Sequence, residues 1–189
     1  MSTSHASLKL AAFALALGAT CAAPARATAP SSPPVPAEPA VGQVAPDFVL
    51  PSTAGDAVRL GGLKGRVVVL YFYPKDETPG CTREACDFRD RHAALDSAGV
   101  VVLGVSTDGL ASHRHFTGKE HLPFPLLSDV DARVCRQYGV YREQERNGRT
   151  FMGIERTTFV IDRTGHIARV WPKVSVNGHV EEVLSFVKG

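Results

Sequence analysis

Long apolar stretches separated by polar turns predict that the chain builds a β-sheet. Residues 66–73 and 100–105 are almost unbroken runs of β-branched, aliphatic and aromatic side chains, which is typical of strands buried on both faces. Residues 157–162 predict a third strand, and the turn Asp162-Arg163-Thr164-Gly165 joins it to a partner at 166–171. We therefore expect these four segments to belong to one sheet.

Helical periodicity predicts that helices alternate with these strands. In the first helix Thr78 can act as the N-cap, Pro79 suits the first turn, and apolar side chains recur at helical spacing to about Ser97. Other elements are expected at 45–60 (strand, turn, strand), 110–121 (helix), 125–128 (short strand or turn), 131–138 (short helix) and 178–187 (helix). This order predicts an α/β fold, with a mixed central sheet and helices on both faces.

Residues 1–27 contain the three parts of a signal peptide. Lys9 gives a weakly basic start, residues 10–17 form an apolar run too short to span a bilayer, and Ala25-Arg26-Ala27 is a small-x-small cleavage site. We therefore expect a periplasmic or secreted protein. The alternative is a cytoplasmic protein whose N-terminus is misassigned.

The remainder of the chain predicts a linker and one domain. Residues 28–40 are rich in Pro, Ala and Ser and cannot bury a core, whereas residues 41–189 are long enough for one α/β domain. Removal of the signal takes away Lys9 and Arg26 and leaves 19 basic and 19 acidic side chains. A net charge near zero gives no electrostatic reason to expect a nucleic-acid partner or stable membrane association.

The predicted mature chain keeps three cysteines, Cys81, Cys86 and Cys135. An odd number cannot pair completely, so at least one free thiol is expected. The buried strand 66–73 delivers Cys81 to the first turn of the next helix, where a thiolate is favoured. Lowering a cysteine pKa from about 8.5 to about 6 requires roughly 3.4 kcal/mol, and a helix N-terminus supplies about 0.3–2 kcal/mol. A nearby cation is therefore expected as well.

Cys86 follows Cys81 by five residues in the predicted helix. Helical geometry separates the two Cα atoms by roughly 8–9 Å, which a disulfide does not tolerate without backbone movement. If the two cysteines pair, the start of the helix must unwind. The alternative is that Cys86 is a small buried side chain, and the same interpretation as a buried, inert thiol is favoured for Cys135.

The segment YFYPKDETPGCTREAC resembles the active-site segment of peroxiredoxins, in particular the atypical two-cysteine bacterioferritin-comigratory (Q-type) group. The motif Pro-x-x-x-Thr-x-x-Cys is intact at Pro74, Thr78 and Cys81, and the resemblance extends over nearly all of residues 41–189. It implies a thioredoxin-like fold with an N-terminal β-hairpin extension. It also implies a thiol-dependent peroxidase for hydrogen peroxide and organic hydroperoxides that needs no cofactor and no metal ion.

The resemblance further implies a role for each residue that matches the motif. Cys81 is the nucleophile that becomes a sulfenic acid, Thr78 hydrogen-bonds the peroxide, and Pro74 shields the site. Arg156 is the cation near Cys81, and Glu84 orients that arginine.

The remaining implications concern recycling of the enzyme. Cys86 is implied as the resolving cysteine, which condenses with the sulfenic acid of Cys81 to a disulfide. A thioredoxin-like donor then reduces the disulfide, and export points to a periplasmic thioredoxin-like protein in that role. The resemblance implies a monomer.

Two other functions compete with the peroxidase. A thioredoxin-type thiol–disulfide oxidoreductase shares the fold, but its usual C-x-x-C is replaced here by C-x-x-x-x-C. A metal-binding or redox-sensing module would use cysteines and histidines such as His113, His115 and His121, but their spacing favours a solvated helix surface.

Two clusters beside Cys81 have structural interpretations. The aromatic side chains of residues 71–73 are expected to pack in the core rather than to form a substrate platform. The charges of Lys75, Asp76 and Glu77 are expected to face water.

Overall fold

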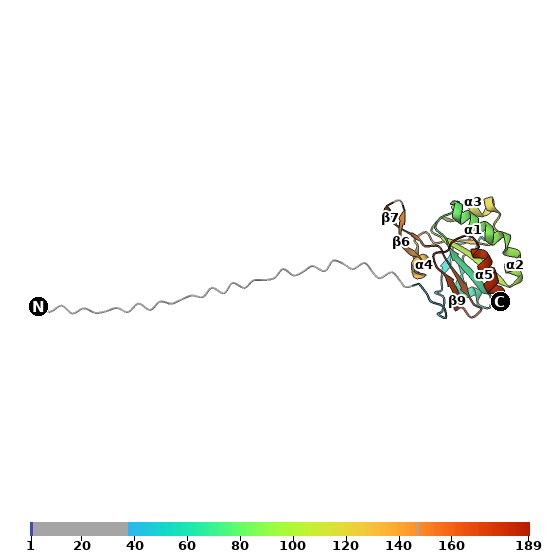
Figure 1. Cartoon of the computed structure of the whole chain (residues 1–189), viewed down its shortest axis with the longest axis horizontal. Helices are drawn as coiled ribbons and strands as arrows, with labels where there is room; N and C mark the ends of the chain where they lie inside the picture. The colour runs from blue at the N-terminus through green and yellow to red at the C-terminus, as the bar shows by residue number, and fades with distance from the viewer. Residues whose placement is uncertain (2–37, 147) are drawn as a thin grey trace. The chain divides into compact units, whose positions relative to one another are not determined.

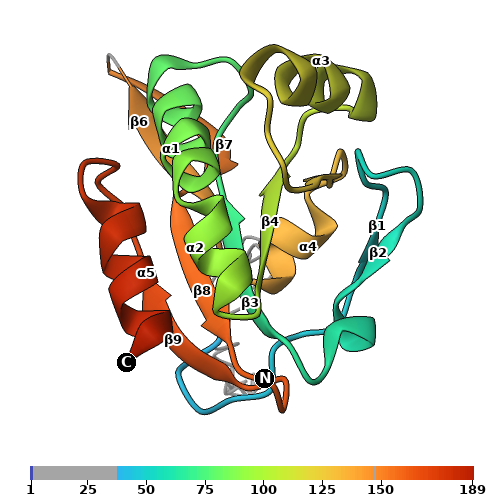
Figure 2. The ribbon, with the colours of Figure 1, turned by 90° about the vertical axis from the view of Figure 1, so that its right-hand side faces the viewer.

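A mixed sheet lies at the centre of the structure. The computed structural model describes Met1 and residues 38–146 and 148–189. The sheet strands are β3 (Val67–Phe72), β4 (Val100–Ser106), β5 (Leu126–Ser128), β8 (Thr157–Ile161) and β9 (Ile167–Trp171). They lie in the order β5-β4-β3-β8-β9. The edge strand β9 is labelled in Figure 1, and β8, β3 and β4 are labelled in Figure 2. β3, β4 and β5 are parallel, whereas β8 runs antiparallel to both β3 and β9.

Helices cover both faces of this sheet, as the sequence predicts. α1 (Pro79–Asp90), α2 (His92–Ser97), α3 (Leu110–Glu120) and α5 (His179–Lys188) contribute to the core on one face. α4 (Arg133–Gln137) packs on the other face, behind the sheet in Figure 2. This arrangement is the thioredoxin-like α/β fold.

Successive side chains of β3 enter opposite cores. Val68, Leu70 and Phe72 belong to the core beneath α4, whereas Val69 and Tyr71 belong to the core beneath α1. This alternation follows from the two-residue period of a strand. It explains why an unbroken apolar run marks a strand covered on both sides.

The first predicted helix is divided in two. The sequence predicts one helix from residue 79 to about 97, but α1 ends at Asp90 and α2 begins at His92. Arg91 separates them because its backbone angles, φ −105° and ψ 2°, leave the helical region. The apolar period continues across this break, so the pattern alone does not reveal it.

Two small hairpins flank the sheet. β1 (Val49–Leu50) and β2 (Val58–Arg59) form the hairpin expected within residues 45–60, followed by a 3₁₀ turn. β6 (Tyr141–Arg146) and β7 (Arg149–Ile154) form a second hairpin that the sequence does not predict. Most side chains of β7 are exposed, so its sequence lacks the alternation of buried and exposed residues by which a strand is predicted.

Apart from Met1, the predicted signal peptide lies outside the described residues, and so does most of the predicted linker. Among the residues that the structure describes, no helix combines the length and the apolarity that a membrane crossing requires.

Candidate active site

Cys81 lies in the first turn of α1, where the sequence places it. β3 ends at Phe72, a short loop follows, and α1 begins at Pro79, so Cys81 is the third helical residue. The first helical hydrogen bond runs from the amide of Thr82 to the carbonyl of Thr78 at 2.8 Å. The amides of Gly80 and Cys81 therefore have no acceptor within the helix and remain free to stabilise negative charge. The Cys81 side chain is only 2% exposed.

Arg156 supplies the cation that the sequence argument requires. Its Nη2 donates a hydrogen bond to the sulfur of Cys81 at 3.1 Å. Although 75 residues separate the two in the chain, Thr157 pairs with Phe72 across β8 and β3. The residue that precedes β8 must therefore lie beside the loop that leaves β3. A guanidinium at this position stabilises charge on the sulfur.

Glu84 holds the other side of this arginine. It lies three residues after Cys81, and therefore on the same face of α1. Its side chain is fully buried, and Oε2 accepts a hydrogen bond from Nη1 of Arg156. Burial raises the pKa of Glu84 to about 7, although Arg156 acts in the opposite direction. Cys81, Arg156 and Glu84 thus form one connected row.

Thr78 and Pro74 lie on the solvent side of the site. Thr78 occupies the N-cap position of α1, as the sequence predicts, but its hydroxyl donates to the carbonyl of Lys75 at 3.0 Å and makes no side-chain capping bond. Pro74 and Thr78 line an open groove of about 440 Å³ together with Phe151 and Met152 of β7. Sequence reasoning missed these two β7 side chains, whose only signal is that two large apolar residues lie in a polar stretch.

Cys86 lies further along the same helix. α1 is continuous from Pro79 to Asp90, so Cys81 and Cys86 keep the helical separation that the sequence predicts. Cys86 is half-buried, and its thiol donates to Oε2 of Glu120 on α3 at 3.5 Å. Burial, with the Glu120 carboxylate acting in the same direction, raises the pKa of Cys86 above its ordinary value.

Cys135 is separated from the site by the sheet. Its side chain is fully buried in the core beneath α4, whereas Cys81 belongs to the core beneath α1. Burial raises the pKa of Cys135. The expectation of a buried thiol is confirmed for this residue. All three described cysteines are free thiols in this structure.

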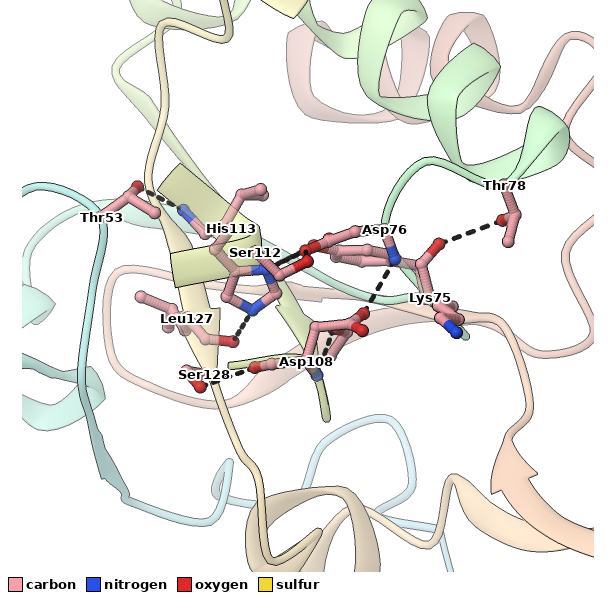
Figure 3. Close-up of polar contacts among 12 residues, drawn as sticks. Thr53, Lys75, Asp76, Thr78, Asp108, Ser112, His113, Leu127 and Ser128 are labelled. Atoms are coloured by element: carbon pink, nitrogen blue, oxygen red, sulfur yellow. Dashed lines mark hydrogen bonds and ion pairs between the residues drawn. The ribbon is translucent and has the colours of Figure 1, made fainter. Parts of the chain in front are cut away.

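The loop before α1 is anchored by a buried polar cluster (Figure 3). Asp76 is 5% exposed, and its carboxylate accepts hydrogen bonds from Tyr73 and Ser112, both at 2.7 Å. His113 contacts the same carboxylate at 2.9 Å and is fully buried. The predictions that Asp76 faces water and that His113 lies on a solvated surface are therefore wrong.

The other predictions around the site have mixed outcomes. Glu77 is exposed, as expected, and pairs with Lys119 at 2.7 Å. The aromatic side chains of residues 71–73 are buried in the core, as expected. Within residues 38–146 and 148–189, no three His, Cys, Asp or Glu side chains gather as a metal-ligand set.

A buried cysteine at a helix N-terminus, hydrogen-bonded by a half-buried arginine on this fold, is the arrangement of a thiol-dependent peroxidase. Residues 41–170 match the model of the AhpC/TSA family. Peroxiredoxin Bcp of Bacillus subtilis is 45% identical over 148 residues, which cover 78% of this chain and 94% of that protein. A bcp relative from Coxiella burnetii is 58% identical over 144 residues, covering 76% and 95%. A solved structure of Xanthomonas campestris peroxiredoxin Q superimposes with a TM-score of 0.71 at 41% identity, covering 75% of this chain and 89% of that one.

The chain therefore belongs to the AhpC/TSA family and, within it, to the Bcp/PrxQ peroxiredoxins. The resemblance stated from the sequence is confirmed, and so are the fold class and the thiol peroxidase activity.

Proposed function

We propose that Cys81 reduces hydroperoxides by direct nucleophilic attack. The thiolate attacks one peroxide oxygen, an S–O bond forms, and the O–O bond breaks. Cys81 becomes a sulfenic acid, and the departing oxygen takes up a proton and leaves as water or an alcohol. The observation that carries this proposal is the hydrogen bond of 3.1 Å from Arg156 to the Cys81 sulfur at the start of α1.

The groups around Cys81 stabilise charge, hold the arginine in place and bind the peroxide. Arg156 and the free amides of the first turn stabilise negative charge on the sulfur and on the departing oxygen. Glu84 keeps the guanidinium in place through its buried carboxylate. Thr78 hydrogen-bonds the peroxide, and Pro74 shields the sulfur from bulk water. The position of both residues at the rim of the 440 Å³ groove supports these roles.

Both hydrogen peroxide and organic hydroperoxides are substrates in this proposal. The groove is open to solvent and exposes Phe151 and Met152, which suits an apolar substituent on the peroxide. A Xanthomonas campestris bacterioferritin comigratory protein, 40% identical to this chain, is described as having alkyl peroxide reduction activity.

Cys86 resolves the sulfenic acid of Cys81. Its thiol loses a proton, the sulfur attacks the sulfenic sulfur, an S–S bond forms, and water leaves. The continuous helix between the two residues means that the start of α1 unwinds in this step. Cys135 is unsuited to the role because it is buried beneath the opposite face of the sheet.

A dithiol donor of the thioredoxin type closes the cycle. It supplies two electrons, reduces the Cys81–Cys86 disulfide, and becomes a disulfide itself. The signal-like sequence of residues 1–27 supports export and a periplasmic donor.

Two measurements test the export and the oligomeric state. N-terminal sequencing of the exported protein should begin near Thr28, and an exported protein that retains Met1 would contradict a cleaved signal. Sedimentation of the same protein should show a monomer.

Disulfide mapping by mass spectrometry tests the thiol roles. The reduced protein is treated with one equivalent of hydrogen peroxide, and wild type is compared with Cys86→Ser and Cys135→Ser. Wild type and Cys135→Ser should form the Cys81–Cys86 disulfide, and Cys86→Ser should accumulate sulfenic acid on Cys81. A disulfide that contains Cys135 would overturn the assignment of Cys86, and full turnover by Cys81→Ser would overturn the whole proposal.

A further inference from the structure

His113 has a hydrogen-bond acceptor at each ring nitrogen. Nε2 lies 3.2 Å from the carbonyl oxygen of Leu127, and a carbonyl only accepts, so this nitrogen carries a proton. Nδ1 lies 2.9 Å and 3.1 Å from the two carboxylate oxygens of Asp76 (Figure 3). The protonation state of the ring therefore depends on whether Asp76 is ionised.

The surroundings of Asp76 favour its ionised form. Burial acts against the charge, but hydrogen bonds from His113, Tyr73 and Ser112 outweigh it and lower the pKa of Asp76. The Tyr73 hydroxyl lies 2.7 Å from this carboxylate and 3.3 Å from Nδ1 of the histidine. An ionised carboxylate only accepts, so Nδ1 also carries a proton.

The loop that Asp76 belongs to carries backbone strain. Glu77, the next residue, has φ +57°, a conformation that residues other than glycine rarely adopt. The amide of Asp76 donates to Asp108 at 2.8 Å, and Asp108 in turn accepts from Ser106 at 2.8 Å. Asp76 is thus fixed through both its backbone and its side chain, midway between Pro74 and Thr78.

We propose that His113 is a positioning residue for the peroxide site: a buried imidazolium that, through Asp76, fixes the loop carrying Pro74 and Thr78. His113 comes from α3, and its hydrogen-bond partners are Asp76, Tyr73 and the carbonyl of Leu127, so it reaches the site through the loop. The inference rests on the roles proposed above for Pro74 and Thr78.

A second buried histidine provides an internal comparison. His179 of α5 is 3% exposed, and its Nε2 lies 2.8 Å from the Thr158 hydroxyl, which can donate or accept. Burial lowers the pKa of His179 to about 4, so its ring is neutral at pH 7. The protein therefore holds one charged and one neutral histidine at similar burial.

The first experiment reads the ring protons by NMR. In the reduced protein at pH 7, both ring nitrogens of His113 should carry a bonded proton, whereas His179 should show one protonated nitrogen. Asp76→Asn should remove the proton from Nδ1 of His113 and leave the His179 signals unchanged. A single protonated nitrogen on His113 in the wild type would overturn the proposal, whatever the activity.

The second experiment separates positioning from simple loss of structure. Stopped-flow kinetics should show that His113→Gln lowers the rate of Cys81 oxidation by hydrogen peroxide about tenfold or more, because misplaced groups lose their alignment with the peroxide. Alkylation of Cys81 by iodoacetamide, which does not use Thr78, should stay within about twofold of wild type. His179→Gln, the matched buried-histidine control, should leave both rates unchanged.

Each failure has a distinct meaning. A folded His113→Gln variant that reacts with peroxide at the wild-type rate would overturn the positioning role, as would equal losses in both rates. If Thr78→Val leaves the peroxide rate unchanged, the role proposed for Thr78 fails while the NMR result for His113 still stands. If His113→Gln does not fold, Asp76→Asn takes its place in the same two rate measurements, with the same outcomes deciding.

Discussion

The buried Glu84 carboxylate should make the protein less stable as the pH rises. An unfolded glutamate titrates near 4.5, whereas burial raises the pKa of Glu84 in the folded protein to about 7. Between these two values the folded state holds a proton that the unfolded state has released. Unfolding therefore releases a proton, and raising the pH favours unfolding throughout this window.

The size of the effect follows from the same two values. A pKa difference of about 2.5 corresponds to about 3 kcal/mol of unfolding free energy, at about 1.4 kcal/mol for each pH unit. Glu84→Gln keeps the shape of the side chain but cannot titrate. The variant should therefore gain about 3 kcal/mol relative to wild type between pH 4.5 and pH 8.

Urea unfolding of both reduced proteins at closely spaced pH values measures this difference. Glu77→Gln is the matched control: a hydrogen bond from Lys119 lowers the pKa of this exposed carboxyl, so its titration lies below the window. A constant difference between wild type and Glu84→Gln would refute the reasoning. A difference of the opposite sign would mean that attraction to Arg156 outweighs the cost of burying the charge.

Three further predictions concern the site and its surroundings. Arg156→Lys keeps the charge but loses the fork that contacts both Cys81 and Glu84, so peroxide oxidation should slow by about a hundredfold in stopped-flow assays; an unchanged rate would mean that charge alone is sufficient. Glu120→Gln removes the carboxylate that holds the Cys86 proton, so the disulfide should form faster after peroxide treatment, while the exposed-carboxylate control Asp96→Asn should not change this rate. Burial lowers the pKa of His179 to about 4, so the unfolding free energy of wild type should fall by about 3 kcal/mol relative to that of His179→Gln as the pH falls from 6.5 to 4. Urea unfolding measures both free energies, and a difference between them that does not change with pH would contradict this.

The sequence was sufficient for the elements that carry a strong pattern. The apolar runs around β3 and β4 predict buried strands because both faces are covered, and the structure confirms both. The energy argument at Cys81 requires a cation, and the family resemblance selects Arg156, which lies 3.1 Å from the sulfur. Motif and physical reasoning were both necessary there, because composition does not distinguish one arginine from another.

The features that the sequence did not predict have different physical causes, and one of them is that partners distant in the chain decide burial. Asp76 lies in a run of charged residues, which predicts exposure. Its carboxylate is buried because Ser112 and His113, more than 30 residues later in the chain, form hydrogen bonds with it. Thr78 occupies the predicted N-cap position, but its hydroxyl donates to the Lys75 carbonyl and accepts no bond from the amides of α1, a detail that residue type alone does not determine. The β6–β7 hairpin is stabilised by the hydrogen bonds between its two strands and has few buried side chains, so the pattern of apolar residues does not predict it.

The sheet that separates Cys135 from the helices above it gives the molecule two internal reporters of opening. A reagent reaches half-buried Cys86 when α1 frays, whereas Cys135, fully enclosed, becomes accessible only when the core itself comes apart. The modification rates of these two sulfurs, followed in one sample, therefore time local melting and complete denaturation separately. A stress that unfolds the protein would lead to modification of Cys135, whereas ordinary turnover would leave Cys135 unmodified.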